Sequence, residues 1–268
     1  MKSPVLDILR PATVEEAVTL LADHQGAARI LAGGQSLVPM LNLRLAAADI
    51  LLDTGAIEEL HAVNSTDQWL RIGARVTHAN IEDGLAGDPT NGMLSHVARD
   101  IAYRAVRNRG SIGGSLAHAD PAADWPVAVS VLGAEIEVAG PNGRRRVPAD
   151  AFFVDVFATD LAEDEMITAV LIPAQTGDLR WSYQKMRKKA GAFGEAIAAV
   201  VQNETSGQMR VYAGSSPLGG PRRLPSLEAR DAGALATVAA LPEFADLDRY
   251  EKQIHKVCVL RAMSEVNR

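Results

Sequence analysis

Ile30-Leu-Ala-Gly-Gly-Gln-Ser-Leu37 and Gly110-Ser-Ile-Gly-Gly-Ser-Leu-Ala-His-Ala-Asp-Pro-Ala-Ala-Asp124 are the two stretches of sequence that decide the fold. Each combines a Gly-Gly pair with small hydroxyl residues. Glycine allows backbone angles that aim successive N–H groups into one concavity, and its missing Cβ lets an anion approach the main chain. One Gly-Gly pair alone is more often a tight turn. Two such segments together indicate a site for an anion such as a diphosphate.

The known sequence patterns of nucleotide-binding sites are absent from both segments. Neither segment contains the GxGxxG pattern of dinucleotide-binding doubly wound folds or the GxxxxGK[ST] pattern of the P-loop. The residue pattern by itself therefore predicts an anion site and does not identify the ligand.

Composition narrows the class of protein. The chain has 268 residues, 47% of them apolar, which is enough for a sizeable core and for two domains. Lys and Arg number 27 against 33 Asp and Glu, a formal charge of −6, so no basic field attracts nucleic acid or an anionic membrane. The apolar runs are far shorter than the roughly 20 residues of a membrane span. With no recognisable export signal at its start, the sequence predicts a cytoplasmic protein.

The cysteine and histidine content argues against a metal centre on this chain. Cys258 is the one cysteine, which excludes an internal disulfide and an iron–sulfur cluster held by about four thiolates. The six histidines show no HExxH spacing, and no carboxylates repeat beside them in a metal-ligand pattern. We expect no metal here, and any iron–sulfur cluster must lie on another chain.

Apolar periodicity predicts mixed helices and strands in the first two thirds of the chain. Thr13-Val-Glu-Glu16 has the form of a capping box, which indicates a helix start. The expected helices cover Thr13–Ala22, Met93–Val106 and Trp125–Leu132, and the expected strands cover Ala28–Ala32, Asp49–Asp53, Leu70–Val76, Glu135–Ala139, Arg145–Val147 and Met166–Ile172. This mixed order is typical of an α+β fold.

A second, smaller domain is expected after Pro173-Ala-Gln-Thr-Gly-Asp178, where turn-forming residues concentrate. We therefore expect domains over residues 1–175 and 176–268. The second should hold three strands, near Trp181–Met186, Ile197–Gln202 and Met209–Ala213, and then two helices. The alanine-rich stretch Asp231–Ala240 is expected to be helical.

The two glycine segments, in the forms AGGQSLVPMLNLR (32–44) and RNRGSIGGSLAHADPAADWP (107–126), resemble the flavoprotein medium subunits of the carbon monoxide dehydrogenase and xanthine dehydrogenase family. DVFATDLAEDEMIT (155–168) and SYQKMRKKAGAFGEAIAAV (182–200) extend this resemblance over nearly the whole chain. It implies an FAD-binding fold of the vanillyl-alcohol-oxidase type in two subdomains, about 1–55 and 56–175. A small C-terminal domain of a three-stranded sheet and helices should follow.

The resemblance also implies which residues bind FAD. Both glycine segments should wrap the diphosphate and ribityl chain with backbone N–H groups and hydroxyls, with Ser36 and Ser111 as side-chain donors. The implied cofactor-binding residues are Ile30, Leu31, Ala32, Gly33, Gly34, Gln35, Ser36, Leu37, Ile101, Gly110, Ser111, Ile112, Gly113, Gly114, Ser115, Asp124, Ile167 and Lys185. FAD should be bound non-covalently, because neither segment places a His or Cys for attachment; His118 is the nearest candidate.

Several of these residues have a plain alternative role. Asp124 matches an acid that accepts hydrogen bonds from the cofactor, but it could instead cap a helix beginning at Trp125. Lys185 matches a lysine near the flavin, or it could be a solvated strand lysine. Ile101 and Ile167 match positions that flank the rings, although such residues are more often ordinary core. Phe193 lies where the family often has an aromatic in front of the ring.

Two arginine groups also have a plain interpretation. Arg107 and Arg109 precede the second glycine segment and could add positive charge near the diphosphate, but we favour their interpretation as helix-end charges. The run Arg144-Arg145-Arg146 in an expected hairpin is interpreted as a solvated surface.

The implied function is electron transfer within a molybdenum hydroxylase. A large subunit with the molybdenum cofactor would hydroxylate the substrate, a small subunit would carry 2Fe-2S clusters, and this chain would pass electrons from FAD to an acceptor. The expected assembly is a dimer of heterotrimers. Two alternatives stay open: a self-contained FAD-dependent oxidoreductase of the same fold, and a nucleotide-binding module without redox activity.

Overall fold

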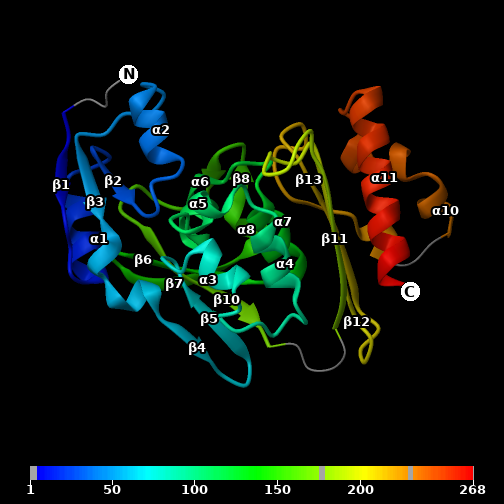
Figure 1. The fold of residues 1–268 in the computed structure, drawn as a ribbon, viewed down its shortest axis with the longest axis horizontal. Helices are drawn as coiled ribbons and strands as arrows, with labels where there is room; N and C mark the ends of the chain where they lie inside the picture. The colour runs from blue at the N-terminus through cyan, green and yellow to red at the C-terminus, as the bar shows by residue number, and fades with distance from the viewer. Residues whose placement is uncertain (1–4, 175–178, 229–231, 268) are drawn as a thin grey trace.

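The computed structural model describes residues 5–174, 179–228 and 232–267. Over these residues the strands form three main sheets of three, five and four strands and a separate two-stranded hairpin. Figure 1 shows the three main sheets following one another along the longest axis of the molecule, from the N-terminal sheet on the left to the C-terminal sheet and helix α11 on the right. The fold is α+β, as the sequence predicts.

The first sheet is parallel, and its strand β2 leads into the first glycine segment. Its strand order is β1-β3-β2, with β1 (Asp7–Leu9), β2 (Ala28–Leu31) and β3 (Ile50–Asp53). Helix α1 (Val14–Asp23) connects β1 to β2. The Thr13 side chain accepts a hydrogen bond from the Glu16 N–H at 3.1 Å, whereas the Glu16 carboxylate accepts from the Ala12 N–H. The predicted helix start is confirmed, although the return bond of the capping box goes to Ala12.

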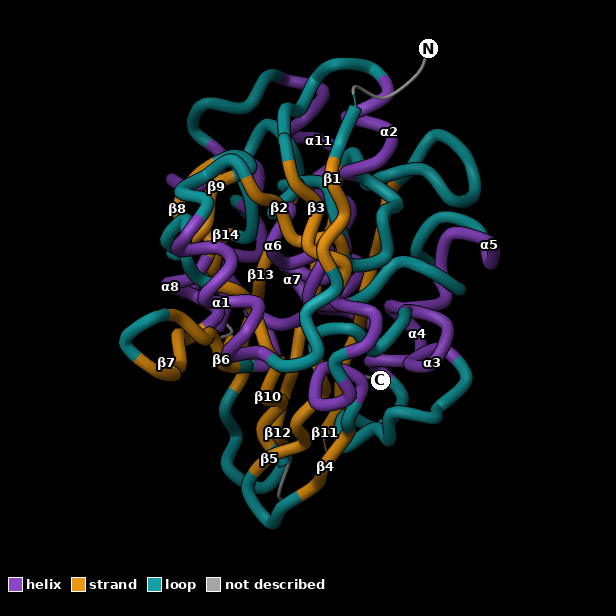
Figure 2. Tube along the Cα trace, turned by 90° about the vertical axis from the view of Figure 1, so that its left-hand side faces the viewer, coloured by secondary structure: helices purple, strands orange, loops and turns teal. Residues whose placement is uncertain are grey.

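The central sheet is antiparallel, in the order β4-β5-β10-β6-β7. Its strands are β4 (Val63–Ser65), β5 (Trp69–Gly73), β6 (Glu135–Gly140), β7 (Gly143–Pro148) and β10 (Met166–Pro173). The 3₁₀ turns η1 (Thr54–Ala56) and η2 (Glu58–His61) lead into this sheet from β3. In Figure 2 the β6–β7 hairpin extends to one side of the molecule.

The arginine run on β7 lies at the surface, as we expected, with side chains 37%, 39% and 51% exposed, and its guanidinium groups also pair with carboxylates. Each guanidinium has an acidic partner: Arg144 pairs with Glu59, Arg145 with Asp160 and Glu165, and Arg146 with Glu135. Because the partners come from η2, β6 and the segment before β10, these ion pairs join the hairpin to the elements around it.

Short helices and a two-stranded hairpin pack between and beside the three main sheets. These elements are α2 (Leu37–Asn42), α3 (His78–Glu82), α4 (Met93–Arg99), α5 (Arg104–Arg107), α6 (Ile112–His118), α7 (Asp124–Leu132), α8 (Ala149–Phe152) and the hairpin of β8 (Phe153–Asp155) and β9 (Ala158–Thr159). All nine residues of α7 are buried. It lies in the same core cluster as residues of the central and C-terminal sheets, and so connects the two.

The single helix predicted over Met93–Val106 is wrong. The chain forms α4, then an irregular turn, then α5, and Ala102 adopts a left-handed conformation with φ 43°. Arg107 stabilises the turn, because its Nη1 donates to the carbonyl oxygens of Ile101 at 2.8 Å and Ala102 at 3.4 Å. The same guanidinium pairs with Glu82. A buried long-range contact therefore overrides the apolar spacing.

The C-terminal sheet has the three predicted strands and a short fourth one. The order is β11-β12-β13-β14, with β11 (Leu179–Met186), β12 (Ala196–Asn203), β13 (Met209–Gly214) and β14 (Arg222–Arg223). It is followed by α9 (Pro225–Glu228), α10 (Ala232–Ala236), η3 (Val238–Ala240), η4 (Pro242–Phe244) and α11 (Arg249–Val266). The helix expected over Asp231–Ala240 is thus divided between α10 and η3, and residue 231 lies outside the described residues.

Successive side chains of β12 point to opposite faces of the C-terminal sheet, and each face packs into a different core. Ile197, Ala199 and Val201 belong to the core around α7, whereas Ala198 and Val200 belong to a second core with α11. This period of two is what a strand buried on both faces produces. The division of the chain near residue 175 stays a prediction, because residues 175–178 lie outside the described residues.

Candidate cofactor-binding site

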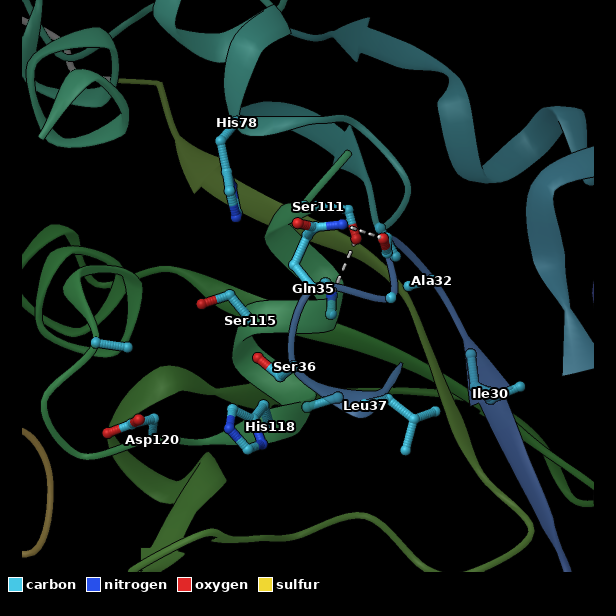
Figure 3. Close-up of a pocket in the computed structure, with 18 of the residues that line it drawn as sticks. Ile30, Ala32, Gln35, Ser36, Leu37, His78, Ser111, Ser115, His118 and Asp120 are labelled. Atoms are coloured by element: carbon cyan, nitrogen blue, oxygen red, sulfur yellow. Dashed lines mark hydrogen bonds between the residues drawn. The ribbon is translucent and has the colours of Figure 1, made fainter. Parts of the chain in front are cut away.

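A cavity of about 690 Å³ lies where the two glycine segments meet. Its walls come from the end of β2, the start of α2, the turn between α4 and α5, helix α6 and the loop after β11. Figure 3 shows Gln35 and Ser36 of the first segment near Ser111 and Ser115 of α6. Of the residues implied by the resemblance, those lining this cavity are Ile30, Ala32, Gly33, Gly34, Gln35, Ser36, Leu37, Ile101, Gly110, Ser111, Gly113, Gly114, Ser115, Asp124, Ile167 and Lys185.

The first glycine segment presents free backbone donors. Within the described residues, none of the N–H groups from Gly33 to Leu37 donates a hydrogen bond to the protein. Gly34 has φ 71°, a left-handed conformation that turns successive N–H groups toward one side. The Ser36 side chain does not cap α2. Five N–H groups and a hydroxyl therefore stand ready for an anionic ligand.

The second glycine segment behaves differently, because its N–H groups are already used. The N–H of Ile112 donates to Val76 O at 3.1 Å, and that of Gly113 donates to Ala74 O at 3.0 Å. Those of residues 114 and 115 donate to the side-chain and backbone oxygens of Ser111, respectively. Backbone donation from 112–115 to the cofactor, as we expected, is not available in this geometry. What this segment offers the cavity is the hydroxyl groups of Ser111 and Ser115.

The glycines serve to bring the two segments into contact. A Cβ placed on Gly33 would lie 2.7 Å from the carbonyl carbon of Arg109 and from the Cα of Gly110. A Cβ on Gly113 would meet the backbone of Ala74 at 2.8 Å. Since Cβ atoms essentially never approach closer than 3.0 Å, these positions admit only glycine without movement of the backbone.

Arg75 is a half-buried cation at the cavity wall, and sequence reasoning missed it. Its Nε and Nη1 atoms are buried and have no hydrogen-bond partner in the described residues. Burial lowers the pKa of its guanidinium, and Arg109 lowers it further, while Asp53 opposes this. A buried guanidinium without hydrogen-bond acceptors is unfavourable. Together with the free N–H groups of residues 33–37, this orphaned charge fits the diphosphate of a dinucleotide cofactor.

His78 is a second missed residue. Trp125 Nε1 donates to its Nδ1 at 3.0 Å, so the neutral ring carries its proton on Nε2. Burial, with a smaller effect of Arg107, lowers the pKa of His78 to about 4. The ring lines the cavity as a neutral donor. No short-range sequence pattern connects Trp125 with His78, so this pair could not be found from spacing.

Asp124 and Lys185 form a buried ion pair at the cavity. Lys185 Nζ lies 2.9 Å from Asp124 Oδ2, and the two side chains are 2% and 4% exposed. Lys185 is therefore not a solvated strand lysine. Helix α7 begins at Asp124 itself, and its N-cap residue Ala123 makes no side-chain cap, so the capping role for Asp124 is also excluded. Tyr183 OH donates to the other oxygen, Oδ1, at 2.7 Å.

Two implied residues do not face the cavity. Leu31 packs against a small cluster under α2, and Ile112 is fully buried in the main core. Ile101 and Ile167 do line the cavity, and Phe193 lines it while remaining 59% exposed. Arg109 is not among the lining residues, although its backbone contacts Gly33.

The comparison with protein families decides the identity. Residues 4–175 match the model of the FAD binding domain in molybdopterin dehydrogenase. The chain belongs to this family. Among its relatives, the nicotine 6-hydroxylase medium subunit of Paenarthrobacter nicotinovorans is 36% identical and aligns over 85% of this chain and 80% of its own length. The carbon monoxide dehydrogenase medium chain of Hydrogenophaga pseudoflava is also 36% identical, over 76% of this chain and 71% of its own.

Solved structures agree with this family. A carbon monoxide dehydrogenase chain from Hydrogenophaga pseudoflava superposes with a TM-score of 0.91 at 31% identity, covering 99% of this chain and 98% of its own. A chain of quinoline 2-oxidoreductase from Pseudomonas putida 86 gives 0.88 at 29% identity, covering 100% and 99%. The chain is thus an FAD-binding medium subunit of the molybdenum hydroxylase family and an oxidoreductase component. Among the described residues, no helix is long and apolar enough to cross a membrane.

Proposed function

We propose that this medium subunit receives electrons from 2Fe-2S clusters on a small partner subunit and passes them through FAD to an external acceptor. A large partner subunit would carry the molybdenum cofactor and the substrate pocket. The observation that carries the proposal is the cavity, whose lining includes residues 33–37 and Arg75: within the described residues, the five N–H groups of 33–37 and the Nε and Nη1 atoms of Arg75 have no hydrogen-bond partner. The one cysteine supports placing the clusters on a partner.

The residues of this chain would hold the cofactor at its diphosphate, at the ribityl chain beside it and around its rings. The N–H groups of residues 33–37 and the charge of Arg75 would bind the diphosphate, and the hydroxyls of Ser111 and Ser115 would bind the chain beside it. Ile101 and Ile167 would exclude water around the rings. When bound, FAD supplies the exchange between single electrons and electron pairs.

A dimer of heterotrimers is the assembly that we propose. The relatives named as medium subunits support a division of the enzyme into small, medium and large subunits. Mass measurement of the co-purified complex would test the stoichiometry directly.

The deciding experiment compares the isolated FAD-loaded chain with the co-expressed three-chain complex, using a dye acceptor and candidate N-heteroaromatic or aldehyde substrates. We expect substrate-dependent dye reduction by the complex only. Equal turnover by the isolated chain would overturn the proposal and favour a self-contained flavoenzyme. A colourless chain that retains no flavin would favour a binding module without redox activity.

A further inference from the structure

The strongest unexplained feature is the set of charges around Asp124, at the contact between α7 and β11. We propose that Tyr183 is a positioning residue that keeps Asp124 ionised, so that the Lys185 charge beside the flavin is balanced and the flavin reduction potential is held low. The proposal rests on the proposed function in one respect, that the flavin ring of FAD lies in the part of the cavity that Lys185 lines, and it is independent of which partner delivers the electrons.

The geometry gives Asp124 two donors from one strand. Tyr183 OH donates to Oδ1 at 2.7 Å, and Lys185 Nζ donates to Oδ2 at 2.9 Å. Lys185 also donates to the backbone oxygen of Asp100 at 3.3 Å. Because Tyr183 and Lys185 are two residues apart on β11, their side chains reach the same face of the sheet. Both carboxylate oxygens are therefore held from one side.

The pKa of the Asp124 carboxyl is raised above its usual value, and its two donors limit that rise. Burial raises the pKa of its carboxyl, whereas Lys185 and the Tyr183 hydroxyl act to lower that pKa. The other charged or titratable groups nearby come from α4 and the segment after it, from the end of β11, and from α11: they are His96, Asp100, Arg187 and Cys258. Arg187 pairs with Asp100 and so balances the charge of that carboxylate, which raises the pKa of Asp124.

Lys185 reaches the cavity as half of a neutral pair. A lone ammonium beside the flavin would favour reduction, because reduction adds negative charge to the ring system. Paired with the Asp124 carboxylate, the ammonium gives little net field. If Asp124 bound a proton, the pair would become a single uncompensated cation. The protonation state of Asp124 therefore controls the charge that the flavin experiences.

Removing the Tyr183 hydroxyl shifts that protonation state. In the Tyr183→Phe variant, Oδ1 loses its donor while burial is unchanged, so the carboxylate takes up one proton from solvent at a higher pH than before. Lys185 is then uncompensated below that pH. The flavin potential becomes more positive as pH falls through the titration of Asp124, and it returns to the wild-type value at higher pH.

Tyr212 on β13 offers a matched control. Its hydroxyl donates to Asp150 Oδ1 at the same distance, 2.7 Å, and its side chain is likewise buried. Asp150 is exposed, and neither residue lines the FAD cavity. The Tyr212→Phe variant therefore removes an equivalent Tyr–Asp hydrogen bond from the same sheet without touching the charges beside the flavin.

The experiment measures the FAD midpoint potential of the full chain across pH, by equilibration with a reference dye, in wild type, Tyr183→Phe, Tyr212→Phe and Asp124→Asn. At the acidic end we expect Tyr183→Phe to shift the dye equilibrium at least tenfold toward reduced flavin, which is about 30 mV for a two-electron couple. Asp124→Asn should show a positive shift at every pH, and Tyr212→Phe should match wild type.

Two results would overturn the proposal. One is a Tyr183→Phe potential that equals wild type at every pH while FAD occupancy is full. The other is loss of FAD from Tyr183→Phe, because that would assign Tyr183 to cofactor binding rather than to positioning. A failure of electron delivery from the partner subunits would leave these potentials unchanged, so the two proposals fail separately.

Discussion

Gly33→Ala tests whether contact between the two glycine segments forms the site. The added Cβ would lie 2.7 Å from Arg109 C and Gly110 Cα, and closer still to the Arg109 oxygen, all inside the 3.0 Å limit. Since the obstacle is backbone, the segments must separate by roughly several tenths of an ångström to 1 Å, a distortion that costs about 1–3 kcal/mol in a packed interior. For a chain of this size, Tm should fall by on the order of 5 °C.

The same displacement moves the free N–H groups of residues 33–37 away from Ser111. Losing one hydrogen bond to a charged group costs about 1.5–3 kcal/mol, so FAD should bind roughly tenfold to a hundredfold more weakly. Flavin fluorescence titration of the apoprotein and thermal unfolding would measure both effects. Because Gly114 has a looser environment, with neighbours at 3.1 and 3.2 Å, Gly114→Ala should give an intermediate result.

Gly207→Ala is the control for the backbone cost of replacing a glycine. Gly207 has φ 71° and nothing within 4 Å of an added Cβ, so only its left-handed conformation is penalised. Its FAD affinity should equal that of wild type. Wild-type affinity and Tm in Gly33→Ala would refute the argument that segment contact forms the site.

Three further predictions follow from burial and charge. Arg75→Gln should weaken FAD binding most at low ionic strength, where charges are least screened, whereas the exposed Arg99→Gln should not; equal salt dependence in both titrations would contradict the role of Arg75. Because burial lowers the pKa of His78 and His255 to about 4, the folded state binds fewer protons than the unfolded state between pH 6.5 and 4. The free energy of unfolding should therefore be intact above pH 6.5 and should fall toward pH 4, by up to about 1.4 kcal/mol per pH unit for each histidine. Urea unfolding of the His255→Gln variant should show a weaker pH dependence than wild type. Cys258 is fully buried with its thiol pKa raised to about 12, so a thiol reagent should label it only in denaturant; rapid labelling of the native chain would show that α11 opens.

Local sequence features predicted much of the fold because they act over short distances. The Thr13 cap placed the start of α1, and the strand predicted near Ile197–Gln202 corresponds to β12. The turn at Ile101 and Ala102 could not be predicted, because it depends on the Arg107 guanidinium folding back onto their carbonyl oxygens.

The glycines of the candidate site could be predicted from the sequence, but the surroundings of its charged side chains could not. The resemblance supplied Asp124 and Lys185 separately, but their pairing, which joins residues 61 positions apart, could not be read from the sequence. Arg75 and His78 carry no motif. Their importance comes from their surroundings in space: Nε and Nη1 of Arg75 have no acceptor among the described residues, and His78 accepts a hydrogen bond from Trp125.

The unequal use of backbone donors in the two glycine segments has a consequence for amide hydrogen exchange. The N–H groups of residues 112–115 are bonded within the protein, so they should exchange slowly with or without cofactor. Those of residues 33–37 have no partner among the described residues, so in the cofactor-free chain they should exchange quickly and become protected when FAD binds. The second glycine segment would thus exchange at the same rates with and without FAD, whereas each N–H group of the first segment would report whether FAD is bound.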